Sequence, residues 1–237
     1  MNANKNWLQR GSLLLGDEWQ ERLCNAHVLI VGLGGVGSWA AEMLCRAGVG
    51  SFTLVDADVV DVTNINRQMP ALVTTVGRSK CEVVAERLQS INSDVSVTVE
   101  RIFVDEVNIS QLMFGQSYDF VVDAIDSLPS KAALITYCWQ HDVRIISSMG
   151  AGAKCDISQI RIGDLWHTEH CTLAKNLRRM LRNTPARASL PVVFSIEPPI
   201  KSAIVPNPSG GKPLIGSIGY FTAVFGCCLA EYVIKNV

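Results

Sequence analysis

A glycine-rich turn near the start of the chain is followed by acidic residues, and this combination is suited to holding a nucleotide. Residues 28–58 run VLIVGLGGVGSWAAEMLCRAGVGSFTLVDAD, in which Gly32, Gly34 and Gly37 fit G-x-G-x-x-G. Such glycines let the backbone approach phosphate, and the next helix presents its N-terminal N–H groups to negative charge. Asp56 ends the following strand, where a carboxylate can accept hydrogen bonds from ribose hydroxyls. The stretch predicts a nucleotide-binding βαβ unit, but it fits NAD and ATP about equally.

The loop after the second predicted strand distinguishes between these nucleotides. Its sequence, DADVVDVTNINRQ, supplies Asp58, Asn64, Arg67 and Gln68, and Lys80 follows it closely. A dehydrogenase holds its pyrophosphate largely through backbone groups and a helix dipole, and transfers nothing at phosphorus. Cleavage between the α- and β-phosphates instead requires cations around the leaving pyrophosphate. Arg67 and Lys80 therefore favour ATP cleavage.

Asp126 is a candidate ligand for the magnesium ion that such a cleavage normally uses. It lies in the segment VVDAIDS, just beyond the fourth predicted strand. Because strand C-termini converge on the ligand crevice of a doubly wound sheet, Asp126 is expected near the glycine turn. Each of these polar residues alone is typical of a solvated charge or a helix cap, and their joint spacing is what predicts a site.

Alternating strands and helices must position these side chains. Apolar β-branched runs predict the strands, and apolar residues at helical spacing predict the helices between them. Ser79 is expected to cap one helix, with Glu82 three residues further on. The alternation predicts an α/β fold with a Rossmann-like, doubly wound, mostly parallel sheet. The expected strands are 27–31, 51–55, 95–102, 118–122 and 143–147, and the expected helices are 36–47, 79–91, 107–114 and 129–141.

The remainder of the chain is expected to elaborate the same single domain, residues 1–237, rather than to form a second one. The nucleotide-binding core spans about 25–155. Beyond it, a strand is predicted at 158–163, the piece LPVVFSI is strand-like, and 184–216 is rich in Pro, Gly and Ser. The chain ends in an apolar helix near 218–234, which falls short of a membrane span and is expected to be buried.

The formal net charge of −1 is unevenly distributed. Residues 1–153 hold 11 Lys and Arg against 17 Asp and Glu, whereas residues 154–237 hold 10 against 5. A polar helix is predicted at 171–183, and its basic residues suit salt-sensitive contacts with nucleic-acid phosphates. An ordinary solvated helix face accounts for these basic residues equally well. The basic residues on one face of this helix are Lys175, Arg178, Arg179 and Arg182.

The eight cysteines are scattered through the chain, and no secretory signal opens it. This usage predicts a reduced, cytoplasmic setting rather than a disulfide framework. No C-x-x-C pair occurs, so a thiolate zinc site is not expected. Cys171 is the best candidate for a nucleophile, although free cysteines are usually small buried hydrophobes.

Taken in order, these motifs resemble the ubiquitin-activating-enzyme superfamily, the group of ThiF, MoeB and HesA, whose smaller members adenylate a carboxylate. The resemblance covers about residues 8–155 in the order that the superfamily shows. The matching motifs are G-x-G-G-x-G from Gly32 to Gly37, D-x-D at Asp56 and Asp58, N-x-x-R-Q from Asn64 to Gln68, Lys80, and D-x-x-D at Asp123 and Asp126.

The resemblance implies roles for these residues. Asp56 is expected to hold the ribose, and Asp126 to hold magnesium near the α-phosphate. The segment QRGSLLLG resembles one through which a subunit lends an arginine to its partner's site, which implies a homodimer and a catalytic role for Arg10. The implied cofactors are ATP and Mg2+, with a monovalent cation also compatible. The implied phosphate ligands are Asn64, Arg67 and Lys80, and the other implied nucleotide contacts are Gly32, Gly34, Gly35, Gly37, Asp58 and Gln68.

A finer resemblance is carried by GGVGSWAAEMLCRAGVG, VTNINRQ, DAIDSLPSKAALI, GAGAK and VFSIEP, which are most similar to the tRNA threonylcarbamoyladenosine dehydratase branch. That branch adenylates the threonyl carboxylate of N6-threonylcarbamoyladenosine at position 37 of tRNA, and the neighbouring carbamoyl group then closes a ring with net loss of water. The implied function of 156–237 is contact with substrate and with a second subunit, and sulfur-transfer or desulfurase proteins are compatible partners. The similarity weakens between 165 and 215, where Pro191 and Val192 stand in place of a cysteine of longer relatives.

Three other functions remain open from sequence. An activator of a sulfur-carrier or ubiquitin-like protein would use the same adenylation site on a protein C-terminus, usually with paired zinc-binding C-x-x-C motifs and a nucleophilic cysteine. An NAD(P)-dependent oxidoreductase explains the glycine turn and Asp56 but leaves Arg67, Lys80 and Asp126 without a role. The third alternative is a nucleotide-sensing dimer or scaffold without catalysis.

Overall fold

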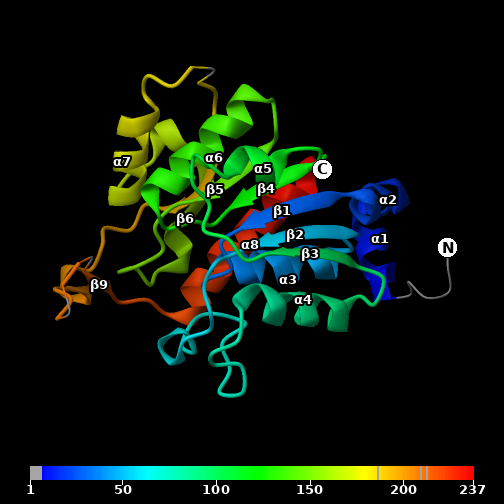
Figure 1. Ribbon diagram of the computed structural model, residues 1–237, viewed down its shortest axis with the longest axis horizontal. Helices are drawn as coiled ribbons and strands as arrows, with labels where there is room; N and C mark the ends of the chain where they lie inside the picture. Colours follow the sequence, from blue (N-terminus) through cyan, green and yellow to red (C-terminus); the bar gives the residue numbers. More distant parts are fainter. Residues whose placement is uncertain (1–6, 186, 209, 212) are drawn as a thin grey trace.

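The computed structural model describes residues 7–185, 187–208, 210–211 and 213–237. A seven-stranded sheet, in the order β3-β2-β1-β4-β5-β7-β6, carries helices on both faces (Figure 1). Every neighbouring pair is parallel except β6 and β7. The predicted Rossmann-like, mostly parallel α/β fold is thereby confirmed. The strands of this sheet are β1 (His27–Val31), β2 (Ser51–Val55), β3 (Ser96–Glu100), β4 (Phe120–Asp123), β5 (Ile145–Ser148), β6 (Ile160–Asp164) and β7 (Pro191–Ser195).

Register in the centre of the sheet brings the ends of several strands together. Val31, the last residue of β1, pairs with Val55 of β2 and with Asp123 of β4. Consequently the residues that follow these strands leave the sheet side by side, and the Gly32 N–H donates to the Val55 carbonyl at 2.8 Å. The central strands β1, β2 and β4 are apolar and buried almost throughout, as expected for strands covered on both faces.

Helices of the two faces enclose two separate cores. Helices α3 (Gly37–Ala47), α4 (Lys80–Ile91) and α8 (Gly219–Asn236) cover one face of the sheet. Helices α5 (Ile109–Met113), α6 (Leu128–Gln140) and α7 (Thr172–Leu181) cover the other (Figure 1). This is the double winding that places ligands at the carboxyl ends of the strands.

The apolar terminal helix is part of the core, as its sequence predicts. Phe221, Phe225 and Leu229 of α8 have no exposed surface and pack among α3 and the central strands. Helix α8 lies very close to the start of α3 at Gly226, because a Cβ on this residue would lie 2.6 Å from the Val36 carbonyl oxygen and 2.7 Å from the Trp39 Cβ. Among the described helices, none is both long and apolar enough to cross a membrane.

Some elements depart from the sequence prediction. Most predicted strands and helices are present, with ends shifted by a few residues. Two helices and one hairpin were not predicted from the sequence. Ser79 is the N-cap residue of α4, as predicted, but its side chain makes no capping hydrogen bond and its Oγ is buried without a partner among the described residues. The unexpected pieces are α1 (Gln9–Leu15), α2 (Asp17–Asn25) and a hairpin of β8 (Ile204–Val205) and β9 (Leu214–Ile215).

Candidate active site

A cleft of about 890 Å³ opens at the carboxyl edge of the central strands. Its walls come from the turn after β1, the loop after β2, the start of α4, the turn after β4 and the end of β5, with Leu173, Ile215 and Thr222 from the C-terminal part. The fold thus brings together residues that the sequence separates by more than ninety positions. The expected site residues that line this cleft are Gly32, Gly34, Gly35, Asp56, Asp58, Asn64, Arg67, Gln68, Lys80 and Asp126.

The glycines of the turn serve two different purposes. Gly32 has φ +91°, and a Cβ there would lie 2.7 Å from the Ala124 carbonyl oxygen, so this position requires glycine for the turn itself. A Cβ on Gly37 would lie 1.8 Å from the Gly32 oxygen; Gly37 packs the helix against the turn and does not line the cleft. A Cβ on Gly34 would meet nothing closer than Gln68 Nε2 at 3.8 Å. The space over Gly34 is therefore available to a ligand.

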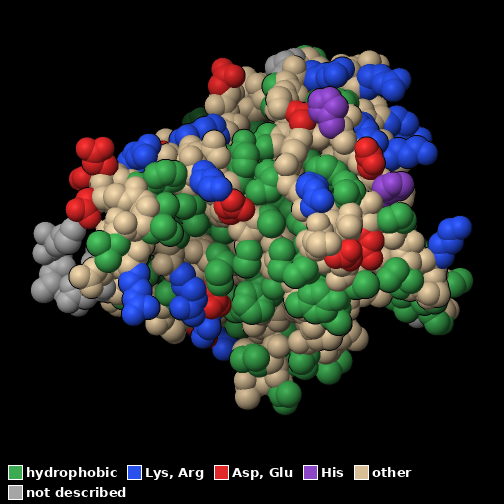
Figure 2. Space-filling model, turned by 180° about the vertical axis from the view of Figure 1, so that it is seen from behind, with side chains coloured by type: hydrophobic (Ala, Val, Ile, Leu, Met, Phe, Trp, Pro, Cys, Tyr) green, Lys and Arg blue, Asp and Glu red, His purple; other side chains and the backbone are tan. Residues whose placement is uncertain are grey.

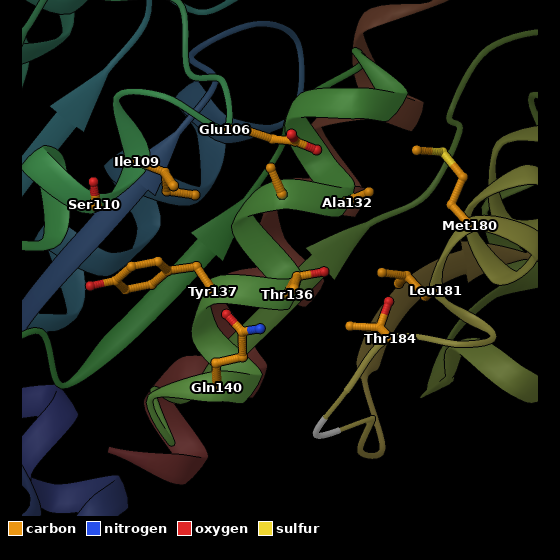
Figure 3. Close-up of a pocket in the computed structure, with 11 residues that line it drawn as sticks. Glu106, Ile109, Ser110, Ala132, Thr136, Tyr137, Gln140, Met180, Leu181 and Thr184 are labelled. Carbon is orange, nitrogen blue, oxygen red and sulfur yellow. The ribbon is translucent and has the colours of Figure 1, made fainter.

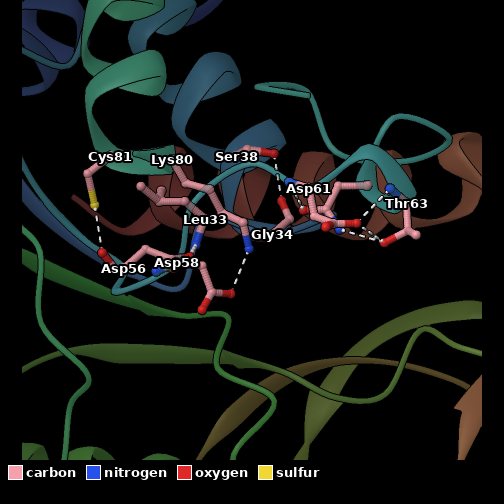
Figure 4. A network of polar contacts seen from close by, with 10 residues as sticks. Leu33, Gly34, Ser38, Asp56, Asp58, Asp61, Thr63, Lys80 and Cys81 are labelled. Atoms are coloured by element: carbon pink, nitrogen blue, oxygen red, sulfur yellow. Dashed lines mark hydrogen bonds and ion pairs between the residues drawn. The ribbon is translucent and has the colours of Figure 1, made fainter. Parts of the chain in front are cut away.

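Asp56 connects the glycine turn to the following loop. Its Oδ2 accepts from the Leu33 N–H at 2.7 Å and its Oδ1 accepts from the Asp58 N–H at 2.8 Å (Figure 4). Each carboxylate oxygen can accept more than one hydrogen bond, so both stay able to bind hydroxyl groups. The position and the remaining capacity of Asp56 suit the predicted contact with a ribose.

Lys80 supplies a buried cation to the cleft. It is the first residue of α4, is 5% exposed, and its Nζ lies 2.8 Å from Asp58 Oδ2, a side chain that is 69% exposed (Figure 4). Beside it, the Cys81 thiol donates to the Asp56 carbonyl at 3.3 Å. Burial, reinforced by the charge of Asp56, raises the pKa of Cys81 to about 12. Cys81 therefore stays protonated and does not compete with the substrate as a nucleophile.

A short 3-10 turn, η2 (Val62–Asn64), places the remaining polar residues of the loop. Asp61 caps this turn by accepting from the Thr63 N–H at 2.8 Å, and Asn64 Oδ1 accepts from the Asp61 N–H. Arg67 Nη1 donates to the Thr63 carbonyl at 2.9 Å, which holds the guanidinium along the wall of the cleft. The loop's many internal bonds explain how a segment without regular structure keeps a binding geometry.

Gln68 has a buried acceptor that the protein leaves unused. The residue is 8% exposed, and its Oε1 has no hydrogen-bond partner among the described residues. Buried polar atoms are nearly always paired in native proteins. Because Gln68 lines the cleft, an N–H or O–H group of a bound molecule would satisfy this oxygen.

The D-x-x-D motif is divided between the cleft and the layer beneath it. Asp126 is exposed, lines the cleft and makes no hydrogen bond or ion pair with a described residue. Asp123 is fully buried and pairs with Lys131 Nζ at 2.7 Å. Sequence reasoning did not single out Lys131, since a lysine near the start of a helix is usually a surface charge; its burial comes from the tertiary packing alone.

The charges of the cleft match a nucleoside triphosphate with a divalent cation. Arg67 and Lys80 offer positive charge to phosphate oxygens, and Asp126 offers a free carboxylate. Mg2+ is normally held by one or two carboxylates together with substrate phosphates and water, so a single exposed Asp126 fits it as the protein ligand. In the described part of the chain, no group of three or more His, Cys, Asp or Glu side chains could hold a metal ion without such help.

Other expected site residues lie outside this cleft. Arg10 is exposed on α1 and is not among the lining residues. Cys171 precedes α7, where its Sγ accepts from the Ala174 N–H at 3.4 Å, and it lies close to Gly150 of the cleft wall. The expected basic residues Lys175, Arg178, Arg179 and Arg182 come from α7 and the residue after it, and none of them lines the cleft.

A second hollow of about 360 Å³ lies between α5, α6 and α7 (Figure 3). Ile109, Thr136, Tyr137 and Met180 are among the side chains around it. None of the expected site residues lines this hollow, and its charged lining is limited to Glu106 among the residues described. The chemistry predicted from sequence is concentrated in the larger cleft.

A Rossmann-like sheet with this cleft defines a nucleotide-binding protein, and comparison with known proteins specifies its family. The sequence pattern of the ThiF family matches residues 8–237, so the chain belongs to the ThiF family. It is 38% identical to the tRNA threonylcarbamoyladenosine dehydratase of Escherichia coli (strain K12), over 98% of this chain and 94% of that protein. The protein of the same name from Bacillus subtilis (strain 168) is 41% identical over 81% of this chain and 75% of its own.

Solved structures give the same relationship. The crystal structure of E. coli tRNA N6-threonylcarbamoyladenosine dehydratase in complex with ATP has a TM-score of 0.89 and 38% identity, covering 99% of this chain and 95% of that one. A second crystal structure of the E. coli enzyme contains AMP and has the same TM-score and identity. The molybdopterin-synthase adenylyltransferase of E. coli is 35% identical over a smaller share, 64% of this chain.

Proposed function

We propose that this protein is an ATP-dependent tRNA threonylcarbamoyladenosine dehydratase. The observation that carries the proposal is 38% sequence identity over nearly the full length of a dehydratase, together with a cleft that collects the cations and the carboxylate needed for adenylation. The relative's crystal structures with ATP and with AMP support the nucleotide. The reaction uses one ATP and releases AMP and pyrophosphate while a ring closes on the modified adenosine.

The residues of the cleft divide the work of adenylation. Asp56 accepts from the ribose hydroxyls, and the open space over Gly34 lets the backbone approach the phosphates. Arg67 and Lys80 stabilise the charge that develops on pyrophosphate as the threonyl carboxylate oxygen bonds to the α-phosphorus. The neighbouring carbamoyl group next attacks the activated carbonyl carbon and loses a proton, and AMP departs with the carboxylate oxygen. The oxygen of the water that is lost therefore leaves in AMP, and its hydrogen is released as a proton. No covalent bond to the protein is required.

Asp126 is the residue proposed to hold magnesium. Its exposed carboxylate faces the same cleft as the phosphate-binding cations and is not engaged by any described neighbour. When bound, magnesium supplies charge neutralisation at the phosphate oxygens. The proposed role of Asp126 is to hold the α-phosphate in a fixed position relative to Lys80. The threonyl carboxylate can then attack the α-phosphorus from the side opposite the leaving pyrophosphate.

The basic helix α7 is proposed to contact the tRNA backbone. Lys and Arg side chains gather at the end of the molecule where α7 lies (Figure 2). Leu173, in the first turn of this helix, lines the cleft, so the helix leads from the cleft to the basic surface. Arg178 differs from its neighbours, because its Nη1 donates to the Leu165 and Thr168 carbonyls at 3.1 and 3.0 Å. The phosphate contacts are therefore assigned to Lys175, Arg179 and Arg182, which are exposed.

A homodimer is part of the proposal, since Arg10 projects from α1 outside its own cleft and would complete that of a second subunit. Exposed apolar residues on α1, Leu13 at 82% and Leu14 at 81%, support an interface at this helix. A cytoplasmic location accords with eight cysteines that are all unpaired. Neither statement is needed for the adenylation chemistry itself.

The decisive experiment is mass spectrometry of nucleosides from tRNA that carries threonylcarbamoyladenosine, after incubation with the protein, ATP and magnesium. The expected result is a mass loss of one water on that nucleoside with stoichiometric AMP. An unchanged nucleoside, together with adenylation of a sulfur-carrier C-terminus, would instead support the carrier-protein activator. That alternative is disfavoured by the lack of C-x-x-C motifs in the sequence.

A further inference from the structure

A completely buried ion pair lies directly beneath the cleft. Lys131 and Asp123 both have side chains with 0% exposure, and Lys131 Nζ lies 2.7 Å from Asp123 Oδ2. The same ammonium donates to Ser147 Oγ at 3.1 Å and to the Ser148 carbonyl at 3.0 Å. Its three N–H groups are therefore all satisfied, and Ser147 Oγ in turn donates to Asp123 Oδ2 at 2.7 Å.

This network joins three elements, each of which has one end at the cleft. Asp123 is the last residue of β4, Lys131 lies in the first turns of α6, and Ser147 and Ser148 end β5. The residues next to these positions, including Ser130 and Met149, line the cleft. One buried ammonium thus ties together two strand ends and a helix start, all within a few residues of the nucleotide site.

The second oxygen of Asp123 shapes the turn that carries Asp126. Asp123 Oδ1 accepts from the Ile125 N–H at 3.0 Å, which bends the chain as it leaves β4. The bent segment packs on the glycine turn, because the position of a Cβ on Gly32 lies 2.7 Å from the Ala124 oxygen and 3.2 Å from the Ile125 nitrogen. Movement of this segment would displace Asp126 and the glycine turn together.

Stability alone does not account for an ion pair in this place. Removing two charges from water is costly, and replacing a buried pair by apolar side chains of similar volume is often neutral or stabilising. Breaking the pair by changing one partner is destabilising, because the other charge is left buried and unpaired. The two kinds of substitution therefore separate a contribution to folding from a contribution to geometry.

We propose that Lys131 is a positioning residue for the adenylation site: through Asp123 it fixes the turn 124–126, and so the place of Asp126 and of the glycine turn. This inference rests on the proposed function for its catalytic consequence. Lys131 touches neither the nucleotide cleft nor the reacting atoms. Its effect is on the distance and direction at which the Asp126 carboxylate meets the phosphates.

The test replaces both charges at once, with the variant Asp123→Leu/Lys131→Met, in the full-length protein. The expected variant folds with an unfolding midpoint close to that of the native protein but binds ATP with magnesium about tenfold more weakly by calorimetry. The Ile125 amide is expected to exchange with solvent at least tenfold faster by mass spectrometry. In turnover, kcat falls and the magnesium requirement rises while the KM for tRNA is unchanged.

A milder variant and a matched control complete the design. Ser147→Ala removes one hydroxyl of the network, folds without a buried charge imbalance, and is expected to show the same changes in smaller size. Glu42→Gln disturbs another buried carboxylate with basic partners, Arg46 and Arg87, none of which lines the cleft, and should leave ATP affinity and magnesium requirement unaltered.

Two results would overturn the positioning role. One is an apolar double variant that is folded and has native ATP affinity, Ile125 exchange and magnesium requirement. The other, if the double variant does not fold, is a Ser147→Ala protein with those three properties unchanged. A native protein that binds ATP but never converts tRNA contradicts the proposed function instead, and the affinity and exchange measurements then still decide the positioning role.

Discussion

The buried ammonium of Lys80 lies 2.8 Å from the exposed carboxylate of Asp58, so the cation proposed to bind phosphate is already held in place. A phosphate oxygen that approaches Lys80 shares the ammonium with Asp58 rather than reorganising a free side chain. This arrangement is preorganised, which is how electrostatic catalysis gains most of its effect.

Replacing Lys80 with Ala is expected to lower kcat/KM for ATP by about 100-fold, since removing one preorganised donor typically costs roughly 2.7 kcal/mol or more. The variant Asp58→Asn keeps Lys80 and should lower kcat/KM for ATP by less than about tenfold. Steady-state AMP formation measures both. A Lys80→Ala enzyme within threefold of the native rate would exclude this lysine from transition-state stabilisation, and Lys235→Ala on α8 provides the surface control.

Asp126→Asn is expected to raise the magnesium concentration for half-maximal activity by about tenfold, because the variant loses the charge of the carboxylate proposed to hold the ion. ATP binding measured without magnesium should stay the same or tighten slightly, since one negative charge is removed from the cleft. A magnesium titration of turnover provides the measurement. An unaltered titration curve would assign the metal to other ligands.

Reversing the charge of Arg179 with Glu is expected to weaken tRNA binding and to reduce the slope of log affinity against log salt by about one unit. The matched reversal, Lys235→Glu, lies near the end of α8, and Figure 1 shows the C-terminus apart from α7, so both quantities should stay unchanged. Filter binding at several salt concentrations measures them. Equal slopes for the native protein and Arg179→Glu would remove α7 from the tRNA interface.

Arg178→Ala is expected to act on stability rather than on tRNA. Its guanidinium donates to two backbone carbonyls, and a hydrogen bond to a charged group typically contributes a net stabilisation of about 1.5–3 kcal/mol. Urea unfolding should show a lower midpoint, with the tRNA salt slope of the folded variant preserved. A stable variant with weakened tRNA binding would reverse this assignment.

Cys171→Ser is expected to retain activity and to stabilise the protein slightly. The Cys171 thiol occupies the N-cap of α7 and accepts the Ala174 N–H at 3.4 Å, a task for which serine is the better residue. The proposed mechanism requires no enzyme thiolate. Loss of turnover in both Cys171→Ser and Cys171→Ala, with native melting temperatures, would favour a covalent route and the carrier-protein activator.

Most of the expected site residues line one cleft, and they could be predicted from sequence because their signals are local. Gly32 with its positive φ, the alternation of apolar runs, and the loop from Asp56 to Gln68 are each contiguous segments whose residue types restrict the backbone directly. The β8–β9 hairpin and α1 gave weak signals, because they bury little apolar surface and their residues are largely exposed. Ser79 stands at the N-cap of α4 as predicted, but it makes no capping bond, since a serine there does so only when its hydroxyl is turned towards the free N–H groups.

The sequence by itself determined the class of fold, and it predicted ATP as the nucleotide together with the candidate phosphate ligands, because periodicity and motif spacing act over a few residues at a time. Only the tertiary structure decided which charges are available for chemistry. Asp123 and Asp126 are three residues apart in one motif, yet packing of α6 buries the first against Lys131 and leaves the second in the cleft. Arg178 and Arg179 are adjacent, yet the chain before α7 binds one and leaves the other exposed. Burial and pairing depend on segments distant in the chain, which spacing along the sequence does not encode.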